Sequence, residues 1–454
     1  MQETWQLRAQ FAQRLSDHLD QEVAGHSALL DVVREVNADV TASLGEKAER
    51  MGSTQRVAVE RHGAIRVGSP AELAQVARVF AALGMHPTGF YDLRDLSDGT
   101  VPIIATAFRP SDPVELERNP FRVFTSLLTT ADHQFFSADL ATRIETFLGR
   151  RELVPARLLT LADRAEAEAG LDDTSAQEFL TLATEAFTRP SAPVDRAWYE
   201  ELAAVSSVAA QIAGVRSTRI HHLAPRVLDL DTFCARMQQR GIETVGGIQG
   251  PPRWSGPDLL VRQATFAAVA EPQSFAEADG RISTDTLKVR FGEVESRGIA
   301  LTRLGRQVYD AFGPGALPDT EEGLASAAFG VFTMTAVPER IRDGRPPAGD
   351  LSSLLAAGWL VAEPVIFEDF LPESAARIFQ SHLSSGRPRQ AWKARHAKWS
   401  GPTLDAGWLA GALGRELLDP DELYWLRSTV SEQVALSELG IRRTRSHTRG
   451  HRND

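Results

Sequence analysis

The sequence predicts an α+β fold in which two similar half-barrel modules are paired and elaborated with large helical insertions. Three observations predict it. Residues 56–110 read as strand, helix, strand and strand, and residues 217–302 repeat that order. Amphipathic helical patterns fill the chain between these two segments, and helices predominate again after residue 303. Two copies of one supersecondary order, separated by helices, indicate two related modules.

The N-terminal 55 residues form the first predicted region, which is helical. The stretches TWQLRAQFAQRLSDHLDQEV and HSALLDVVREVNADVTASL both repeat apolar residues at spacings of three and four. That period places the apolar side chains on one face of a helix.

The first module is expected at residues 56–111. RVAVERHGAIRVG combines β-branched residues with a final glycine, which is typical of a strand. The next segment begins with Ser69 as N-cap, Pro70 and Glu72 in the first turn, and ends near Gly84, so a helix is expected there. HPTGFYDL then leads into a further strand, VPIIATAFRP.

A helical insertion is expected at residues 112–214, because four amphipathic stretches follow one another from LATRIETFLGR onward. The second module is expected at 215–302, with strands in STRIHHLAP, DLLVRQATFAAVAE and LKVRFGEVESRGIALT and a helix in DLDTFCARMQQRGI. Residues 303–440 are expected to add helices and one late strand that complete the pocket. Residues 441–454 are predicted to be a disordered basic tail, because 442–454 contain five arginines and one aspartate.

Composition narrows the function classes. The 454 residues carry a net charge of −11, which argues against a nucleic-acid partner. A single cysteine, Cys234, excludes an internal disulfide and favours a reducing compartment. No apolar run reaches the roughly 18 residues of a membrane span, and the N-terminus lacks the pattern of a secretory signal. We therefore expect a cytoplasmic protein with no membrane partner. The motifs of dinucleotide, P-loop, zincin and α/β-hydrolase sites are absent from the sequence.

A distributed metal site is the remaining chemistry that the residues suggest. Two histidines and one carboxylate on one face are the usual ligands of non-haem Fe(II), and they leave coordination positions open. The predicted strands offer His62, then His221 or His222, then Glu293 or Glu295. Neighbouring strand residues face opposite sides, so only one of the two adjacent histidines can point inward. The two glutamates face the same side, so alternation cannot choose between them.

Two further polar residues lie on these strands. Arg66 follows His62 by four residues and shares its face, where its guanidinium could hold a substrate carboxylate through a bidentate contact. A surface salt bridge is the alternative for this arginine. Gln263 lies among apolar residues in mid-strand, where a buried amide needs partners, so it is expected to be a structural clamp or a ligand-binding group.

Six motifs, in this order, resemble the 2-oxoadipate dioxygenase/decarboxylase (hydroxyglutarate synthase) family of the vicinal oxygen chelate superfamily. The resemblance covers about residues 10–390, and the motifs are RHGAIRVGSPAELA, NPFRVFTSLL, IHHLAPRVLDLD, LLVRQATFAA, RFGEVESRGIALT and FEDFLPESAARIFQSHL. The resemblance implies a vicinal-oxygen-chelate barrel of two βαβββ modules with helical insertions. It also implies an enzyme, a non-haem iron dioxygenase, whose cofactor is Fe(II).

The family's functional residues can be carried over onto matching positions. His62, His222 and Glu293 match the metal ligands, with Glu293 preferred to Glu295, and His221 replaces a family asparagine. Arg66 matches the arginine that binds a substrate carboxylate, and Gln263 and Ser374 are expected to help shape the pocket. The implied reaction consumes O2, removes C1 of a 2-oxo acid as carbon dioxide and hydroxylates the shortened product. From 2-oxoadipate, an intermediate of lysine degradation in the resembled family, the product is 2-hydroxyglutarate.

One departure from the family pattern bears on the substrate. Glu373 stands where the family usually has an apolar residue, and Arg377 stands where glycine is usual. A carboxylate about 4 Å from a second substrate carboxylate costs about 4 kcal/mol at an effective dielectric of roughly 20, which is on the order of a thousandfold in binding. Glu373 in the pocket therefore predicts a keto acid with a neutral or cationic far end. Alternatively, Glu373 pairs with Arg377, four residues on.

Two other functions stay open at this point. One is a non-oxidative, metal-dependent isomerase or lyase reaction on the same scaffold, and the other is sequestration of a small ligand in the barrel. Uptake of O2 with release of carbon dioxide distinguishes the first alternative, and an intact metal triad argues against the second.

Overall fold

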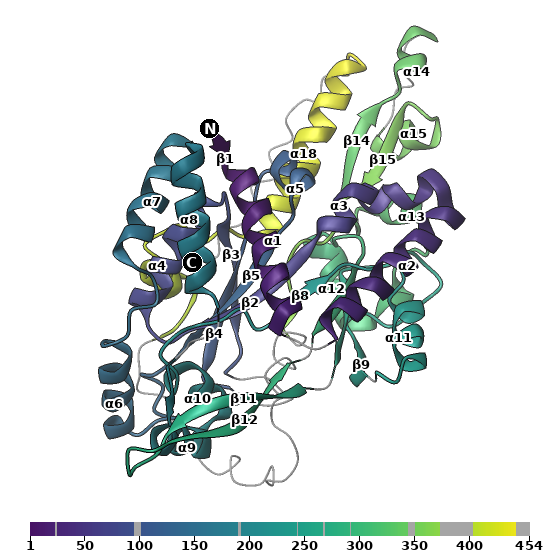
Figure 1. Cartoon of the computed structure of the whole chain (residues 1–454). Coiled ribbons are helices and arrows are strands. Elements are labelled where there is room, and N and C mark those ends of the chain that lie inside the picture. Colours follow the sequence, from purple (N-terminus) through teal and green to yellow (C-terminus); the bar gives the residue numbers. More distant parts are fainter. Residues whose placement is uncertain are drawn as a thin grey trace. The chain divides into compact units, whose positions relative to one another are not determined.

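The computed structural model describes residues 1–22, 25–94, 101–188, 192–242, 244–266, 268–290, 292–343, 350–372 and 403–441. Their elements are shown in Figure 1. The chain divides into two compact units. The first unit contains residues 1–251, 261–297 and 368–420, and the second contains 252–260, 298–367 and the chain from 421 onward. The basic tail predicted at 441–454 lies outside the described residues, except for Ile441.

The N-terminal segment is helical, as predicted. It contains α1 (Thr4–Glu22), α2 (His26–Leu44), the 3-10 helix η1 (Gly45–Met51) and α3 (Thr54–Val59). The last of these corrects a prediction, because residues 56–59 were expected to begin a strand. The side chain of Ser53 accepts a hydrogen bond from the Arg56 amide and so caps a short helix at this point. The strand β2 (Arg61–Val67) begins only after it.

The first module contributes four strands to a five-stranded sheet with the order β3-β4-β5-β2-β8. These are β2, β3 (His86–Asp92), β4 (Ile103–Arg109) and β5 (Arg122–Leu128), and the fifth strand is the short β8 (Leu223–Pro225) from the range of the second module. The predicted helix is α4 (Pro70–Ala82), with Ser69 as its N-cap. The strand β5 lies within the range expected to be helical and follows the short helix α5 (Pro113–Arg118). Every residue of β5 is buried, and such a run lacks the alternation that reveals a strand in a sequence.

Strand alternation gives the sheet two different faces. Ile65 and Val67 of β2 belong to a core cluster that also contains residues of α1, α4, α7 and α8. Ala64 belongs to a second cluster, with Phe124 of β5. His62 and Arg66 alternate with Ile65 and Val67, so they lie on the same face as Ala64. We call this the site face.

The helices of the insertion expected at 112–214 follow β5 and so begin later than predicted. They are α6 (Ala138–Leu148), α7 (Ala156–Glu168), α8 (Asp173–Ala186), α9 (Arg196–Val205) and α10 (Ser207–Ala213). Figure 1 shows α7 and α8 beside α4, with which α7 makes contact. Three very short strands also belong to this unit: β1 (Gln2–Glu3), β6 (Gly170–Leu171) and β7 (Val194–Asp195).

The second module contains α11 (Leu230–Gln239) and a three-stranded sheet with the order β13-β10-β9. Its strands are β9 (Thr244–Gln249), β10 (Val261–Phe266) and β13 (Glu293–Arg297). Between β10 and β13 the chain forms the antiparallel hairpin of β11 (Ala268–Ala276) and β12 (Ile282–Arg290), which belongs to a different sheet. The two long strands predicted here therefore each divide into two. Of the strand expected at 217–225, only β8 forms.

The two modules have mirrored strand orders. In the first, β2 is its first strand and pairs in parallel with β5, its last. In the second, β8 is the first strand and is joined to β13, the last, by a parallel bridge between Arg226 and Glu295. The two first strands, β2 and β8, pair with each other in antiparallel orientation. The modules thus meet at their first strands.

The second unit contains mostly helices, as expected. It includes α12 (Arg303–Phe312), the 3-10 helix η2 (Pro314–Ala316), α13 (Glu321–Ser326), α14 (Pro338–Asp343), α15 (Leu351–Ala356) and the antiparallel pair β14 (Phe332–Ala336) and β15 (Leu360–Pro364). The late strand predicted near residue 360 is β15. The last helices are α17 (Ala406–Leu413), which belongs to the first unit, and α18 (Pro420–Glu438), which belongs to the second from Asp421 onward. Among the described helices, none is long and apolar enough to span a membrane.

Candidate metal centre

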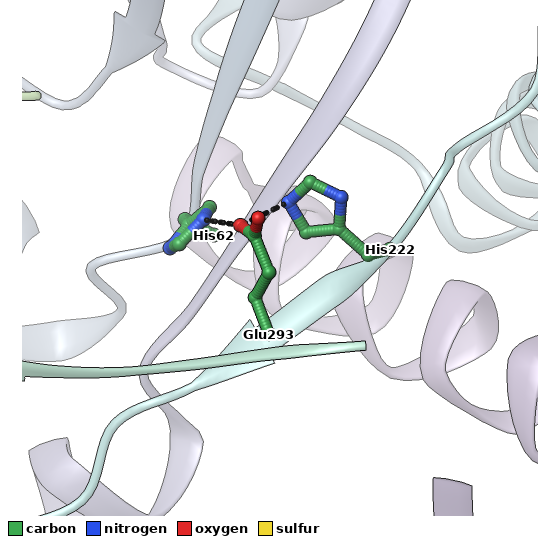
Figure 2. Close-up of side chains that lie close together, drawn as sticks. All are labelled: His62, His222 and Glu293. Atoms are coloured by element: carbon green, nitrogen blue, oxygen red, sulfur yellow. Dashed lines mark ion pairs between the residues drawn. The ribbon is translucent and has the colours of Figure 1, made fainter. Parts of the chain in front are cut away.

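Three buried side chains converge in the first unit. His62, His222 and Glu293 each offer one ligand atom, and these atoms lie within 4.8 Å of one another. The Nε2 atoms of His62 and His222 are 3.4 Å and 3.0 Å from the same Oε2 atom of Glu293. Figure 2 shows both imidazoles directed at that carboxylate. The arrangement joins side chains that are far apart along the chain.

The strand order explains this convergence. His62 lies on the site face of β2 and pairs with Ala224 of the neighbouring strand β8. His222 stands two residues before Ala224, directly before β8 begins. Glu293 is the first residue of β13, the strand bridged to the chain just after β8. The pairing of the two modules at β2 and β8 therefore positions all three side chains.

Burial and charge determine the electrostatics of His62. The ring is 1% exposed and Glu293 is fully buried. Burial alone would lower the pKa of His62, but the carboxylates of Glu295 and Glu293 outweigh that effect and raise the pKa above its ordinary value of 6.5. Two anionic groups therefore make the position of this ring favourable to a positive charge.

Second contacts hold two of the three residues in place. The Nδ1 atom of His62 lies 2.7 Å from Oε2 of Glu295. The hydroxyl of Thr265, on β10 opposite Glu293, donates a hydrogen bond of 3.2 Å to Oε1 of Glu293. Burial opposes the charge of Glu295, but the guanidinium of Arg297 and the imidazole of His62 lower the pKa of this carboxyl to about 2. Glu295 is thus a carboxylate at neutral pH.

A buried network of ions extends from Glu295. Arg122 contacts Glu295, Glu60 and Glu368 at 3.3 Å, 2.8 Å and 2.5 Å. Arg226 contacts Glu60 at 2.9 Å, and Arg56 forms a short ion pair with Glu368. Each ion here has at least one partner of opposite charge, as buried charges require. The network fixes the strands β2, β5 and β13 relative to one another at the site.

The segment that follows β15 also reaches the site. Phe370 packs edge-on against the His62 ring, at a centroid distance of 5.2 Å, and against Phe124 at 5.1 Å. Asp369 receives two hydrogen bonds from Arg109, at 2.7 Å and 3.1 Å. An apolar ring therefore covers one side of His62.

The structure brings together His62, His222 and Glu293, which the sequence analysis singled out. Glu295 contacts His62 from the other side of the ring. His221 donates its backbone amide to the Ala64 carbonyl at 2.9 Å and is not a member of the group.

The other predicted site residues have different positions. Arg66, four residues after His62 on β2, is buried and donates a short hydrogen bond to the side chain of Gln211 of α10. Gln263 is buried on β10, where it pairs with Glu295 and lies 3.4 Å from the Gln249 side chain. Glu373 and Ser374 lie outside the described residues.

Several residues around this site were not predicted from the sequence. Thr265 and Phe370 contact the converging residues, and the ions of the buried network support them. Thr265 lies in a quoted motif, but its role depends on the pairing of β10 with β13 in register, Thr265 opposite Glu293. A single sequence does not display that register. The available signal for Thr265 was its position two residues after Gln263, which places both side chains on the same face of the strand.

The residues present fit a divalent transition metal. Two imidazole nitrogens and one carboxylate oxygen are the donor set typical of non-haem Fe(II). Ligand atoms about 2.1 Å from one ion and at right angles lie about 3.0 Å apart; the two distances from Glu293 to the histidines are 3.0 Å and 3.4 Å, and all three ligand atoms lie within 4.8 Å of one another. The site can therefore hold one metal ion.

Comparison with known proteins gives a consistent result. The family model for 2-oxoadipate dioxygenase/decarboxylase matches residues 11–382. A 2-oxoadipate dioxygenase/decarboxylase of Mycobacterium bovis is 46% identical over 93% of this chain and 96% of its own length. That of Escherichia coli is 37% identical over 92% of this chain and 95% of its own. The crystal structure of hydroxyglutarate synthase from Pseudomonas putida with 2-oxoadipate has a TM-score of 0.80, 31% identity, and coverage of 97% and 99% of the two chains.

Proposed function

This chain belongs to the 2-oxoadipate dioxygenase/decarboxylase family of enzymes, and from that premise we propose how its residues carry out the reaction. We propose that it is an Fe(II)-dependent enzyme that converts 2-oxoadipate and O2 into 2-hydroxyglutarate and carbon dioxide. The atoms balance, because one oxygen atom of O2 enters the new carboxylate and the other enters the hydroxyl group. The convergence of His62, His222 and Glu293 is the observation that carries the proposal.

His62, His222 and Glu293 would hold the iron. When bound, Fe(II) supplies a Lewis acid for the keto acid and the electrons that activate dioxygen. The chain's contribution is to keep both imidazoles and the carboxylate fixed and dry. All three side chains are buried, and Phe370 shields one edge of His62. Exclusion of water protects a reactive site from side reactions.

Arg66 would anchor a carboxylate of the substrate. It shares the site face of β2 with His62, and strand geometry places their Cα atoms about 13 Å apart. On that face Ala64 of β2 and Ser126 of β5, which pairs with Arg66, are small, whereas Phe124, which pairs with Ala64, is large and packs against Phe370. A planar guanidinium matches a carboxylate through two parallel hydrogen bonds.

Gln263 would orient the substrate through its side-chain amide. It lies on the same face of its sheet as Thr265 and Glu295, since these residues alternate with the core residues Ala264 and Val294. Its amide contacts Gln249, which leaves further hydrogen-bonding capacity for a ligand. Ser374, from the motif that begins with Phe367, would complete the pocket.

The mirrored strand orders support a vicinal-oxygen-chelate barrel. Each module places its first strand beside its last, and β2 and β8 join the two modules. His62 comes from the first strand of the first module, His222 from the residue just before the first strand of the second, and Glu293 from the last strand of the second. This is the arrangement that we propose for the substrate cavity.

The charge of Glu373 bears on which keto acid the enzyme prefers. The P. putida protein binds 2-oxoadipate in its crystal structure. If Glu373 of this chain faces the cavity, its charge opposes the far carboxylate of 2-oxoadipate and favours a keto acid with a neutral or cationic end. Assays with 2-oxoadipate, 2-oxohexanoate and 2-oxo-6-aminohexanoate distinguish these cases. Turnover of 2-oxoadipate far above the other two would rule out the altered preference.

The reaction is tested by measuring oxygen uptake and carbon dioxide release together, after anaerobic loading of the protein with Fe(II). We expect one carbon dioxide for each O2 consumed in the presence of a 2-oxo acid. Conversion of the keto acid without oxygen uptake would contradict the proposal and indicate a non-oxidative reaction. Metal and ligand binding with no turnover of any keto acid would indicate a binding protein.

A further inference from the structure

Glu295 lies behind the metal residues and has no exposed surface. Three side chains approach its carboxylate. His62 Nδ1 lies 2.7 Å from Oε2, and Arg297 contacts both oxygens at 2.7 Å and 2.9 Å. Arg122 reaches Oε1 at 3.3 Å. Two nitrogen atoms therefore lie within 3.3 Å of each oxygen of Glu295, and a carboxylate oxygen usually accepts from no more than two donors.

This saturation separates the roles of two glutamates that stand two residues apart on one face of β13. Glu293 directs Oε2 at the Nε2 atoms of both histidines. Glu295 directs its oxygens at two arginines and at the opposite nitrogen of His62. A metal bound to Glu295 would have to displace Arg297, which holds it at two points and is itself buried. Glu295 is therefore not a replacement ligand.

The contact between Glu295 and His62 determines which ring nitrogen is available. Neutral imidazole carries one N–H, and a carboxylate can only accept. A proton on Nδ1 that is donated to Glu295 leaves the Nε2 lone pair directed at Glu293 and His222. Such a carboxylate behind a metal-binding histidine fixes the tautomer and the orientation of the ring.

We propose that Glu295 is a positioning residue, clamped by Arg297 and Arg122, that fixes the His62 imidazole with Nε2 toward the metal and so sets the metal affinity of the site. The inference rests on the proposed function only in assuming that His62 is a metal ligand. The clamp explains why two arginines are buried beside a cation site: they neutralise Glu295 and hold it rigid, so that it accepts from His62 and does not bind the metal.

The first test determines the tautomer of His62 directly. The protein is labelled with ¹⁵N-histidine, loaded with Zn(II) as a diamagnetic probe, and studied by long-range ¹H–¹⁵N correlation, with His62→Gln used to assign the His62 signals. We expect protonated Nδ1 and metal-bound Nε2 in His62. A spectrum in which Nε2 carries the proton and Nδ1 binds zinc would overturn the proposal.

The second test compares Glu295→Gln with Glu60→Gln by anaerobic titration with Co(II), followed by its visible absorption. Glu60 is the matched control: it is equally buried and contacts Arg122, Arg226 and Arg297, so it shares both clamping arginines with Glu295, but none of its described contacts is to the His62 ring. We expect the Co(II) Kd to rise about tenfold in Glu295→Gln. This is the low end of the loss of affinity seen when a residue behind a metal ligand is replaced, because the amide oxygen of glutamine can still accept from Nδ1 of His62. Glu60→Gln should stay within about twofold of the wild type.

Three outcomes separate the alternatives. An unchanged Kd in Glu295→Gln, with its circular dichroism intact, contradicts the positioning role. An equal rise in both variants shows a general effect of removing a buried charge and also contradicts it. If the wild type does not bind Co(II), or binds it equally well after Glu293→Ala, the proposed metal site itself is wrong, whatever Glu295 does.

Discussion

Replacing Thr265 by valine should weaken metal binding about tenfold. The change removes one hydroxyl and keeps the shape of the side chain. In the structure that hydroxyl donates to Oε1 of Glu293 at 3.2 Å, while Oε2 faces the two histidines. Without the hydrogen bond, the carboxylate can rotate, and the incoming metal must order it.

The distance sets the expected magnitude. Hydrogen bonds between a hydroxyl and an oxygen are commonly about 2.7–2.8 Å long, so a 3.2 Å bond is a weak example. Hydrogen bonds to charged groups contribute about 1.5–3 kcal/mol, and the lower value of about 1.5 kcal/mol corresponds to roughly a tenfold change in Kd. Anaerobic titration with Co(II) measures this change directly.

A matched substitution on another strand provides the control. Thr125 of β5 is fully buried, and its hydroxyl has no hydrogen-bond partner among the described residues. Thr125→Val therefore makes the same chemical change without removing a hydrogen bond, and its Kd should equal that of the wild type. If Thr265→Val and Thr125→Val bind Co(II) equally well, the reasoning about Glu293 is refuted.

Three further predictions concern the substrate, acid stability and packing. Arg66→Met should raise the KM for the keto acid at least thirtyfold, because losing one partner of a buried charge pair costs about 2–5 kcal/mol. Co(II) binding should stay unchanged in this variant. An unchanged KM would show that Arg66 does not bind the substrate. Burial opposes the charge of Glu368, but Arg56 and Arg122 lower the pKa of this carboxyl below 4.5 in the folded protein. As the pH falls, the unfolded chain therefore takes up the proton before the folded protein does. The free energy of unfolding should fall as the pH drops below about 4.5. Denaturant titrations should show a smaller pH dependence in Glu368→Gln, and an identical one would contradict the assignment. A Cβ at Gly63 would lie 2.5 Å from Cδ1 of Ile220, so Gly63→Ala should destabilise the fold by about 1–3 kcal/mol in thermal unfolding; an unchanged Tm would show that Ile220 adapts without cost.

The sequence carried enough information for the choice of residues and for most helices. Periodicity with the Ser69 cap located α4, and amphipathic periodicity alone located the insertion helices, because both are local signals. The strand alternation of Arg66 with His62 likewise placed both residues on one face. The family resemblance supplied the choice of His222 over His221 and of Glu293 over Glu295.

The sequence did not show which strand residues pair with each other or which distant side chains come into contact. The strand β5 is buried on both faces, so its residues do not alternate and its pairing with β2 is invisible in one sequence. The contact of Glu295 with His62 depends on how β13 lies against the first module. The contact of Phe370 with His62 depends on how the chain returns to the site about seventy residues after β13. These are long-range packing results, which local propensity does not encode.

The central claim is that His62, His222 and Glu293 bind one metal ion together. The most direct test is anaerobic incubation with Fe(II), removal of unbound metal by gel filtration, and measurement of iron per chain in the wild type and in His62→Ala, His222→Ala and Glu293→Ala. We expect about one ion per wild-type chain and less than about a tenth of an ion in each folded variant, because two remaining ligands hold Fe(II) weakly. Full iron occupancy in any one of the three folded variants would contradict the assignment of that residue and of the site as described.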